Sequence, residues 1–334
     1  MARSGDNAFN QGLEYPVLIL SSEAGFGNRS VGDALKDVLD QEKGVYHVHV
    51  ESLLPVDIVS KDFERYRLIC EKAPWILYFM YGMPIAYWLK YRIEDLIGKD
   101  SLTALSDFIK ERGIKTIFAT NHRALFWSGF VRRRNNLDCE IRGLLTDYCV
   151  NPGWRYLPWN EVSVFYGPIE KDLIYPELRD KYVVSDIPIE HGFNTLSGVG
   201  DVNNVLVTGG GWGLGDIEDI VSDLLEVRPT PKIHVVCGAN DRLFQRLLSR
   251  RGENLMVYGT VDSLLPLMGV CASIITKPGG VTLTEAFHSK RQIFLIPGLP
   301  VCEKKNEYYA INNFGAKNYS TKSFRKWYSE NISV

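Results

Sequence analysis

The sequence predicts an α/β protein of two domains, each a mostly parallel sheet covered by helices. Its 334 residues exceed one ordinary α/β unit, for which roughly 150 residues is typical. In both halves, short apolar runs typical of strands alternate with amphipathic stretches typical of helices, and this alternation favours parallel sheets. The segment 186–203 between the halves has no apolar periodicity and contains Pro188, Gly192, Gly198 and Gly200. We interpret it as an interdomain linker.

The N-terminal domain is predicted to span residues 1–190. Its first strand, 16–20, is followed by a loop and by a helix with one apolar face, and further strands are expected at 45–50, 115–119 and 140–145. The C-terminal domain is predicted to span residues 200–318. Its strands are expected at 204–208, 233–237, 256–258, 273–276 and 293–296, with helices at 216–225 and 242–250.

The last segment, 319–334, is predicted to form a helix over 320–332, and its return to the first domain is one alternative. Ligands of open α/β sheets bind at the carboxyl ends of the strands, and clefts between domains are favoured pockets. We therefore expect the chemistry in the loops that follow the strands, in an interdomain cleft.

The composition excludes several classes of protein. Hydrophobic residues at 45% and charged residues at 23% are ordinary values for a globular chain and exclude a disordered one. A net charge of −2 gives no reason to expect nucleic acid as a partner. The 6 cysteines include no C-x-x-C pair, which argues against a disulfide framework or a structural zinc site.

The sequence also bears on localisation. Residues 1–11 are polar and lack the apolar region of a signal peptide, so we expect a cytoplasmic protein. The apolar stretch 73–89 contains Gly82 and Pro84 and is shorter than the roughly 20 residues of a spanning helix, so we do not expect it to cross a bilayer.

Three loops of the C-terminal half carry candidate chemistry. The glycine-rich loop 209–215 lies between a predicted strand and a predicted helix, where backbone N–H groups and a helix start favour phosphate; a tight turn is the alternative. A second glycine turn, 276–286, also precedes a helix, although the spacing of Thr282 and Glu285 is equally that of a capping box. In the third loop, Glu303 and Asn306 suit sugar hydroxyls.

These motifs resemble those of nucleotide-sugar glycosyltransferases, a family that includes monogalactosyldiacylglycerol synthases and bacterial processive diacylglycerol glucosyltransferases (the GT28-like group). The resemblance covers most of the chain. It includes the loops SSEAGFGN at 21–28 and TDYCVNPGW at 146–154, the linker IPIEHGF at 187–193 and VCGAN at 236–240. Its most specific part is TKPGGVTLTEA at 276–286 followed by Glu303 and Asn306.

The resemblance implies a GT-B fold, with the acceptor in the N-terminal domain and the UDP-sugar in the C-terminal one. It implies that the loop 209–215 and the turn at Gly279 and Gly280 lie near the diphosphate, Glu285 on the ribose and Glu303 near the hexose, without a metal. The donor-binding residues implied in this way are Gly209, Gly210, Gly211, Trp212, Gly213, Gly238, Asn240, Lys277, Pro278, Gly279, Gly280, Thr282, Glu285, Glu303 and Asn306. Gly25, Phe26 and Gly27 of the first loop are candidates for the acceptor side.

The chain departs from the family at the expected catalytic base. Relatives carry histidine where this sequence has Asn28, often histidine at Asn151, and glutamine at Cys302. An asparagine cannot take a proton from a hydroxyl near neutral pH. His122 and Asp147, which follow predicted strands, are the nearest replacements, with Glu23 third. For His122 the alternative is a structural hydrogen bond.

A membrane-facing segment is also expected. The stretch 75–88 is rich in aromatic residues, among them Trp75, Phe79 and Trp88, and basic residues flank it. Such a stretch suits the interface of an anionic membrane, where basic side chains meet lipid headgroups; a core helix is the alternative. The basic run 132–134 is either a second lipid contact or a solvated helix face.

The resulting hypothesis is an inverting hexosyl transfer from a UDP-sugar to a lipid hydroxyl, diacylglycerol being the leading acceptor. We expect peripheral association with the inner face of a membrane. Two alternatives stay open: a nucleotide-sugar epimerase of the same fold, and a UDP-sugar-binding protein that has lost its base.

Overall fold

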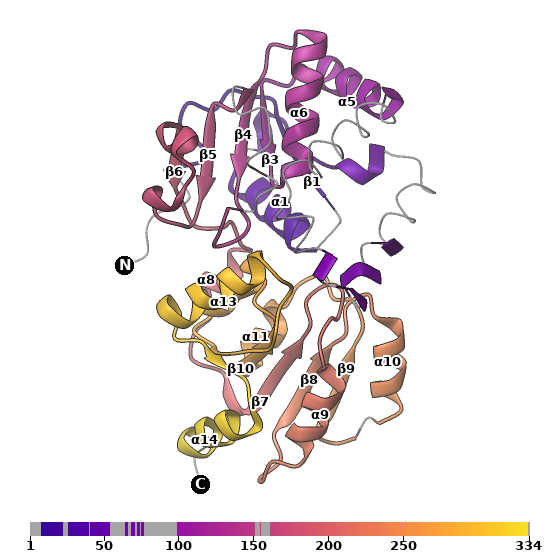
Figure 1. The fold of residues 1–334 in the computed structure, drawn as a ribbon, viewed down its shortest axis with the longest axis vertical. Coiled ribbons are helices and arrows are strands. Elements are labelled where there is room, and N and C mark those ends of the chain that lie inside the picture. The colour runs from indigo at the N-terminus through magenta and orange to yellow at the C-terminus, as the bar shows by residue number, and fades with distance from the viewer. Residues whose placement is uncertain are drawn as a thin grey trace. The chain divides into compact units, whose positions relative to one another are not determined.

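The computed structural model of the chain describes residues 8–22, 26–39, 41–53, 64–65, 68–70, 72–73, 75–76, 99–150, 154, 161–250 and 252–332. The chain divides into two compact units, each with its own sheet (Figure 1). Unit 1 comprises Met1–Glu190 with Pro300–Cys302, and unit 2 comprises His191–Leu299 with Glu303–Val334.

Unit 1 is built on a parallel sheet in the order β2-β1-β3-β4-β5-β6, here called sheet A. Its strands are β1 (Val17–Ser21), β2 (Val45–His49), β3 (Thr116–Ala119), β4 (Glu140–Leu144), β5 (Val164–Gly167) and β6 (Tyr182–Val184). The helices are α1 (Phe26–Val38), α5 (Lys99–Glu111) and α6 (His122–Asn135), with 3₁₀ turns at Gln41–Lys43, Val50–Leu53, Lys171–Leu173 and Pro176–Lys181. The predicted strands of this half are confirmed; β5 and β6 were not predicted.

Unit 2 is built on a second parallel sheet, sheet B, in the order β12-β11-β10-β7-β8-β9. Its strands are β7 (Asp201–Thr208), β8 (Lys232–Val236), β9 (Leu255–Tyr258), β10 (Cys271–Thr276), β11 (Gln292–Leu295) and β12 (Lys317–Asn318). Its helices are α8 (Gly192–Thr195), α9 (Ile217–Leu225), α10 (Asp241–Leu248), α11 (Leu265–Val270), α12 (Gly280–His288), α13 (Cys302–Asn313) and α14 (Thr321–Asn331). The predicted linker 186–203 extends too far, because it contains α8 and the first residues of β7.

The final helix, α14, packs on unit 2. Phe324, Trp327 and Tyr328 belong to the same buried core as β7, β8 and α9, and α14 lies against α9. Polar contacts agree, since the Thr321 hydroxyl donates to Asp223 (2.6 Å) and the Tyr328 hydroxyl to Asn203 (3.2 Å). These contacts do not fit the alternative of a return to the N-terminal domain.

Both sheets have a topological switch point, where neighbouring strands send the chain in opposite directions. In sheet A it lies between β1 and β3, and in sheet B it lies between β7 and β10. Sheet B has the strand order of dinucleotide-binding folds, and ligands of such sheets bind at the carboxyl ends of the strands beside the switch point. The topology thus directs attention to the loops after these four strands.

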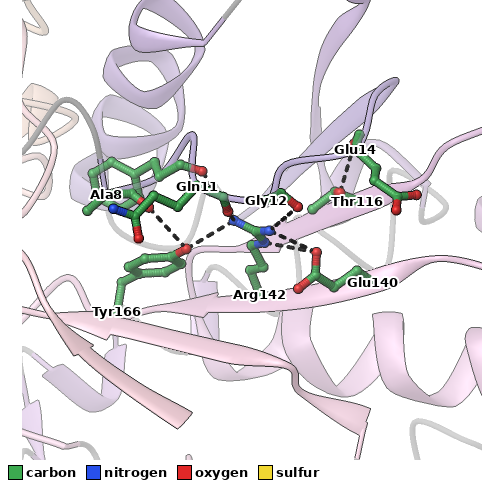
Figure 2. A network of polar contacts seen from close by, with 9 residues as sticks. Ala8, Gln11, Gly12, Glu14, Thr116, Glu140, Arg142 and Tyr166 are labelled. Carbon is green, nitrogen blue, oxygen red and sulfur yellow. Dashed lines mark hydrogen bonds and ion pairs between the residues drawn. The ribbon is translucent and has the colours of Figure 1, made fainter.

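A buried arginine holds the N-terminal segment against the opposite, amino edge of sheet A (Figure 2). The Arg142 guanidinium of β4 donates to the carbonyls of Phe9 (3.2 Å), Gln11 (3.0 Å) and Gly12 (2.9 Å). It also pairs with Glu140 at 2.9 Å and donates to the Tyr166 hydroxyl at 3.1 Å. The Arg142 side chain is only 3% exposed, and these bonds satisfy its buried charge.

Candidate functional site: two sheet edges

Four loops meet at the carboxyl edge of sheet B. The loop after β7 contains Gly210, whose φ is +72°, and a Cβ there would collide with the Lys277 side chain, which follows β10. The Lys277 ammonium pairs with Glu303, which lies beyond β11. The second Glu303 oxygen accepts from the Leu299 N–H (2.5 Å). Three predicted donor loops are therefore joined at one place.

The loop after β8 is joined to the same place. The Gly211 carbonyl accepts from the Ala239 N–H (2.8 Å), and Asn240 donates to the Gly213 carbonyl (3.1 Å). Gly238 has φ +57°, and a Cβ there would collide with the Gly211 carbonyl. Asn240 also caps α10 by accepting from the Leu243 N–H (3.0 Å), so its side chain organises the loop.

The first residue of helix α12 tests the capping box that was the alternative role for Thr282 and Glu285. The helix begins at Gly280 with Gly279 as N-cap, and Thr282 therefore lies inside its first turn. A Thr282 capping box is wrong for that reason. Glu285 lies one turn further on, buried at 8% exposure. Glu285 is therefore a buried acidic residue in the second turn of α12, beyond the positions that cap the helix.

Other predicted donor residues are also placed by the structure. Asn306 of α13 is fully buried and donates to the Pro278 carbonyl (3.0 Å), so it links α13 to the loop after β10. Trp212 is half-buried in the glycine-rich loop. At Gly209, a Cβ would collide with the backbone of Leu214. Gly279 is open, since a Cβ there would meet no atom within 4 Å.

At the carboxyl edge of sheet A, Asn28 lies in the first turn of α1, which begins at Phe26 and Gly27. Its side-chain oxygen accepts from the Thr146 hydroxyl (3.1 Å), which lies beyond β4. Asp147 follows Thr146 and is half-buried, as is His122 at the start of α6. The switch-point loops thus bring together Asn28 and the region of both predicted bases; Glu23, Gly25 and Asn151 lie outside the described residues.

A buried charged network at the same edge was not predicted. Ser22, after β1, donates to the Glu51 carboxylate, after β2, and Arg123, at the start of α6, lies 3.8 Å from it. Glu51 is 4% exposed. The Arg123 guanidinium also lies over the Trp127 ring, 5.8 Å from its centroid. This network fixes the ends of three neighbouring strands.

A second unpredicted cluster lies between sheet A and α1. The Ser21 hydroxyl oxygen lies 2.7 Å from His47 Nε2 and 2.7 Å from His49 Nδ1, and His47 Nδ1 lies 2.9 Å from Asp33 Oδ1. Burial lowers the pKa of His47, opposed by its bond to Asp33. A sequence signal existed: the alternation His47-Val-His49 places both rings on one face of a strand.

The predicted membrane segment is largely outside the described residues. Phe79 and Trp88 fall there, whereas Trp75 is described and is 62% exposed. Of the helices in the described ranges, none combines the length and apolarity needed to cross a bilayer. In the basic run, Arg132 and Arg133 pair with Glu161 at 3.0 and 3.4 Å.

Comparisons with known proteins agree with this architecture. No protein-family model matches the sequence. The chain is 24% identical over 317 residues to a processive diacylglycerol β-glucosyltransferase of Bacillus cytotoxicus, covering 88% of this chain and 79% of that protein. Among solved structures it is similar to MurG of Acinetobacter baumannii (TM-score 0.56, 12% identity, 95% and 90% of the chains). It is also similar to Os79 of O. sativa in complex with UDP (TM-score 0.56, 9% identity, 93% and 89%).

The two parallel sheets and these similarities define the class of fold: the chain has the two-domain α/β architecture of GT-B glycosyltransferases. The predicted fold is confirmed. Within this class of fold, its sequence is similar to those of the processive diacylglycerol glucosyltransferases, at 24–25% identity over 88% of the chain, as the sequence resemblance predicted.

Proposed function

We propose that this protein transfers a hexose from a UDP-sugar to a lipid hydroxyl, that of diacylglycerol, with inversion at the anomeric carbon. The observation that carries the proposal is the convergence of the loops after β7, β8, β10 and β11 at the switch point of sheet B. The names of the similar proteins support it, because one is a diacylglycerol glucosyltransferase and another was solved with UDP.

The donor site is proposed to work mainly through backbone groups. The loop 209–215 and the start of α12 present N–H groups and a helix dipole to the diphosphate, which favours negative charge there without a metal. Glu285 is proposed to accept hydrogen bonds from the ribose diol. Glu303, held by Lys277, is proposed to lie beside the hexose.

In the proposed reaction the acceptor oxygen attacks the anomeric carbon from the face opposite the diphosphate. The bond from that carbon to the β-phosphate oxygen breaks, and its electron pair leaves with UDP. The developing charge is stabilised by the N–H groups described above. The acceptor proton passes to a general base, for which the sequence predicts His122 or Asp147, with Glu23 next.

The membrane part of the proposal rests on the exposed ring of Trp75, which begins the predicted interfacial stretch. An indole with an apolar body and a polar N–H suits the headgroup region. We propose peripheral association with a membrane surface, through which the lipid acceptor reaches sheet A.

One observation favours a second candidate, a UDP-sugar-binding protein without transferase activity. Asn28 stands where the sequence resemblance implies a histidine, and its side chain accepts a hydrogen bond from Thr146. An asparagine held in this way orients a hydroxyl but takes no proton. The alternative predicts UDP binding without transfer.

Incubation of the purified protein with UDP-glucose, UDP-galactose, UDP-N-acetylglucosamine or UDP-glucuronate separates these readings. Each donor is tested with and without vesicles that contain diacylglycerol, and UDP release and glycolipid are measured. The proposal expects both products only when vesicles are present. UDP binding without either product supports the second candidate, and conversion of the donor without lipid contradicts both.

Glu285→Ala tests the donor site itself. Loss of hydrogen bonds to a carboxylate costs about 1.5–3 kcal/mol, which is roughly 10- to 150-fold in UDP affinity. Glu330→Ala is the matched control, because Glu330 is an exposed residue of α14. Calorimetry on both folded variants gives the affinities. Equal UDP affinity in the two variants would remove Glu285 from the site.

A further inference from the structure

The cluster of Asp33, His47, Ser21 and His49 forms one continuous chain of hydrogen bonds. Ser21 is fully buried, so its hydroxyl is no nucleophile for a bound substrate. His47 is also enclosed, with a side chain 6% exposed. His49, at the carboxyl end of β2, is half-buried. Asp33, at the other end of the chain, lies on α1 with a side chain 58% exposed, so His49 is the partly open member at a strand end.

The chemistry of the groups fixes the direction of these bonds. An ionised Asp33 only accepts, so His47 donates from Nδ1 and its Nε2 carries a lone pair. Burial lowers the pKa of His47, which agrees with a neutral ring. The Ser21 proton then points to His47 Nε2. Because Ser21 has no second proton, its oxygen accepts from Nδ1–H of His49, and Nε2 of His49 is left as the basic nitrogen.

Helix α1 relates His49 to the position of the missing family histidine. A Cβ at Gly32 would collide with the His47 ring, so α1 lies directly against that ring. His49 is two residues further along β2, about 6.6 Å. Helix α1 runs in the opposite direction with about 1.5 Å per residue. The helix residue level with His49 is therefore about four positions before Gly32, which is Asn28.

We infer that His49 is the general base of the proposed transfer, with Ser21, His47 and Asp33 as positioning residues that hold its Nε2 unprotonated. The inference rests on the proposed function. From the neighbouring strand, level with Asn28, His49 supplies an imidazole where the sequence resemblance implies a histidine. His122 and Asp147 are half-buried at the same sheet edge.

The proposed step balances. The proton of the acceptor hydroxyl moves to Nε2 of His49 as the acceptor oxygen bonds to the anomeric carbon and UDP leaves with the electron pair. His49 then carries one positive charge, which its Nδ1–H bond to Ser21 stabilises. Release of the proton to water restores the neutral ring for the next turnover.

The first test needs no activity. Ring ¹⁵N chemical shifts of the full-length protein at pH 7.5 report the tautomer of each histidine, and His49→Gln identifies its signals. The inference expects Nδ1–H and a bare Nε2 for His49, and a shift of these signals in His47→Gln because the chain is interrupted. A protonated Nε2 in neutral His49 would overturn the inference whatever the enzyme transfers.

The second test is kinetic. Glutamine at position 49 keeps an N–H for Ser21 but has no basic nitrogen, so His49→Gln is expected to lower kcat about 10²- to 10⁴-fold and to abolish the acid limb of its pH profile. UDP affinity and the unfolding midpoint should stay unchanged. His191→Gln, at an exposed histidine of unit 2, is the matched control. A kcat within threefold of the parent overturns the inference.

The two hypotheses fail in distinguishable ways. An active parent in which His122→Ala or Asp147→Asn abolishes the acid limb, and His49→Gln does not, refutes the role of His49 alone. A parent that binds UDP but transfers no sugar to any acceptor refutes the proposed function, and the catalytic role of His49 with it, even when the ring nitrogens have the expected tautomer.

Discussion

The Arg142 network allows a stability change to be worked out from its contacts (Figure 2). Arg142→Met removes bonds to three carbonyls, to the Tyr166 hydroxyl and to Glu140, while an unbranched apolar side chain fills much of the space. Breaking one partner of a buried pair costs about 3–5 kcal/mol. Glu140 is 27% exposed and recovers some solvation. We therefore expect a loss near the lower end, about 3 kcal/mol.

Urea unfolding followed by circular dichroism measures this loss. Excess UDP, at about 100 times its Kd, should stabilise unit 2 by about 2.7 kcal/mol and separate the transitions of the two units. Arg142→Met should then shift the transition that UDP does not affect, with little change in UDP affinity. Arg134→Met is the control, because Arg134 is exposed and lies over the Phe130 ring.

The result that would refute the reasoning is a loss below about 1 kcal/mol in Arg142→Met, the size expected of an exposed residue. A loss equal in the transitions of both units would also contradict it, because Arg142 contacts only unit 1 among the described residues. Limited proteolysis gives an independent measurement, since the segment 8–14 should become a cleavage site once its carbonyls lose the guanidinium.

Three further predictions follow from the structure. Lys277→Met should destabilise unit 2 by about 1.5–3 kcal/mol because it leaves the Glu303 carboxylate, 12% exposed, without its ion pair. In urea unfolding, the double variant with Glu303→Met should recover most of the lost stability, but its turnover should stay low. Full recovery of turnover would limit the pair to a structural role. Serine at Trp75, Phe79 and Trp88 together should abolish sedimentation with anionic vesicles and leave UDP affinity intact; a loss of folding would place these rings in a core. Because burial lowers the pKa of His47, the unfolded chain binds the extra proton first, so unit 1 should lose stability as pH falls below about 6.5. As the pH is lowered, the urea midpoint should fall less in His47→Gln than in the parent protein. An equal fall in the two proteins would refute the assignment to His47.

Much of the fold could be predicted from the sequence because buried parallel strands are short apolar runs. The strands β1, β3 and β10 are wholly buried and β7 is buried over 205–208, and each was expected within a few residues of its position. β5 and β6 were missed because they are only 4 and 3 residues long and contain tyrosine and valine in no clear alternation. Their pairing depends on neighbouring strands rather than on local pattern.

The donor loops were predictable because glycine marks places where backbones approach closely, as at Gly210 and Gly238. The ion pair of Lys277 with Glu303 could not be predicted, because 26 residues separate its members. The capping box at Thr282 was wrong because spacing alone does not say where a helix begins. The histidine chain depends on the parallel register that pairs Ser21 with His49, and no local pattern reveals a register.

The packing of α14 on unit 2 has a consequence for how such enzymes can be recombined. Apart from the short segment Pro300–Cys302, everything from His191 onward belongs to one compact unit, and Phe324, Trp327 and Tyr328 complete its core. A gene fusion joined near residue 190 would therefore exchange unit 2 for that of another protein without cutting its hydrophobic core. Chimeras with relatives of different sugar preference would test the proposal that unit 2 binds the donor, with unit 1 kept constant.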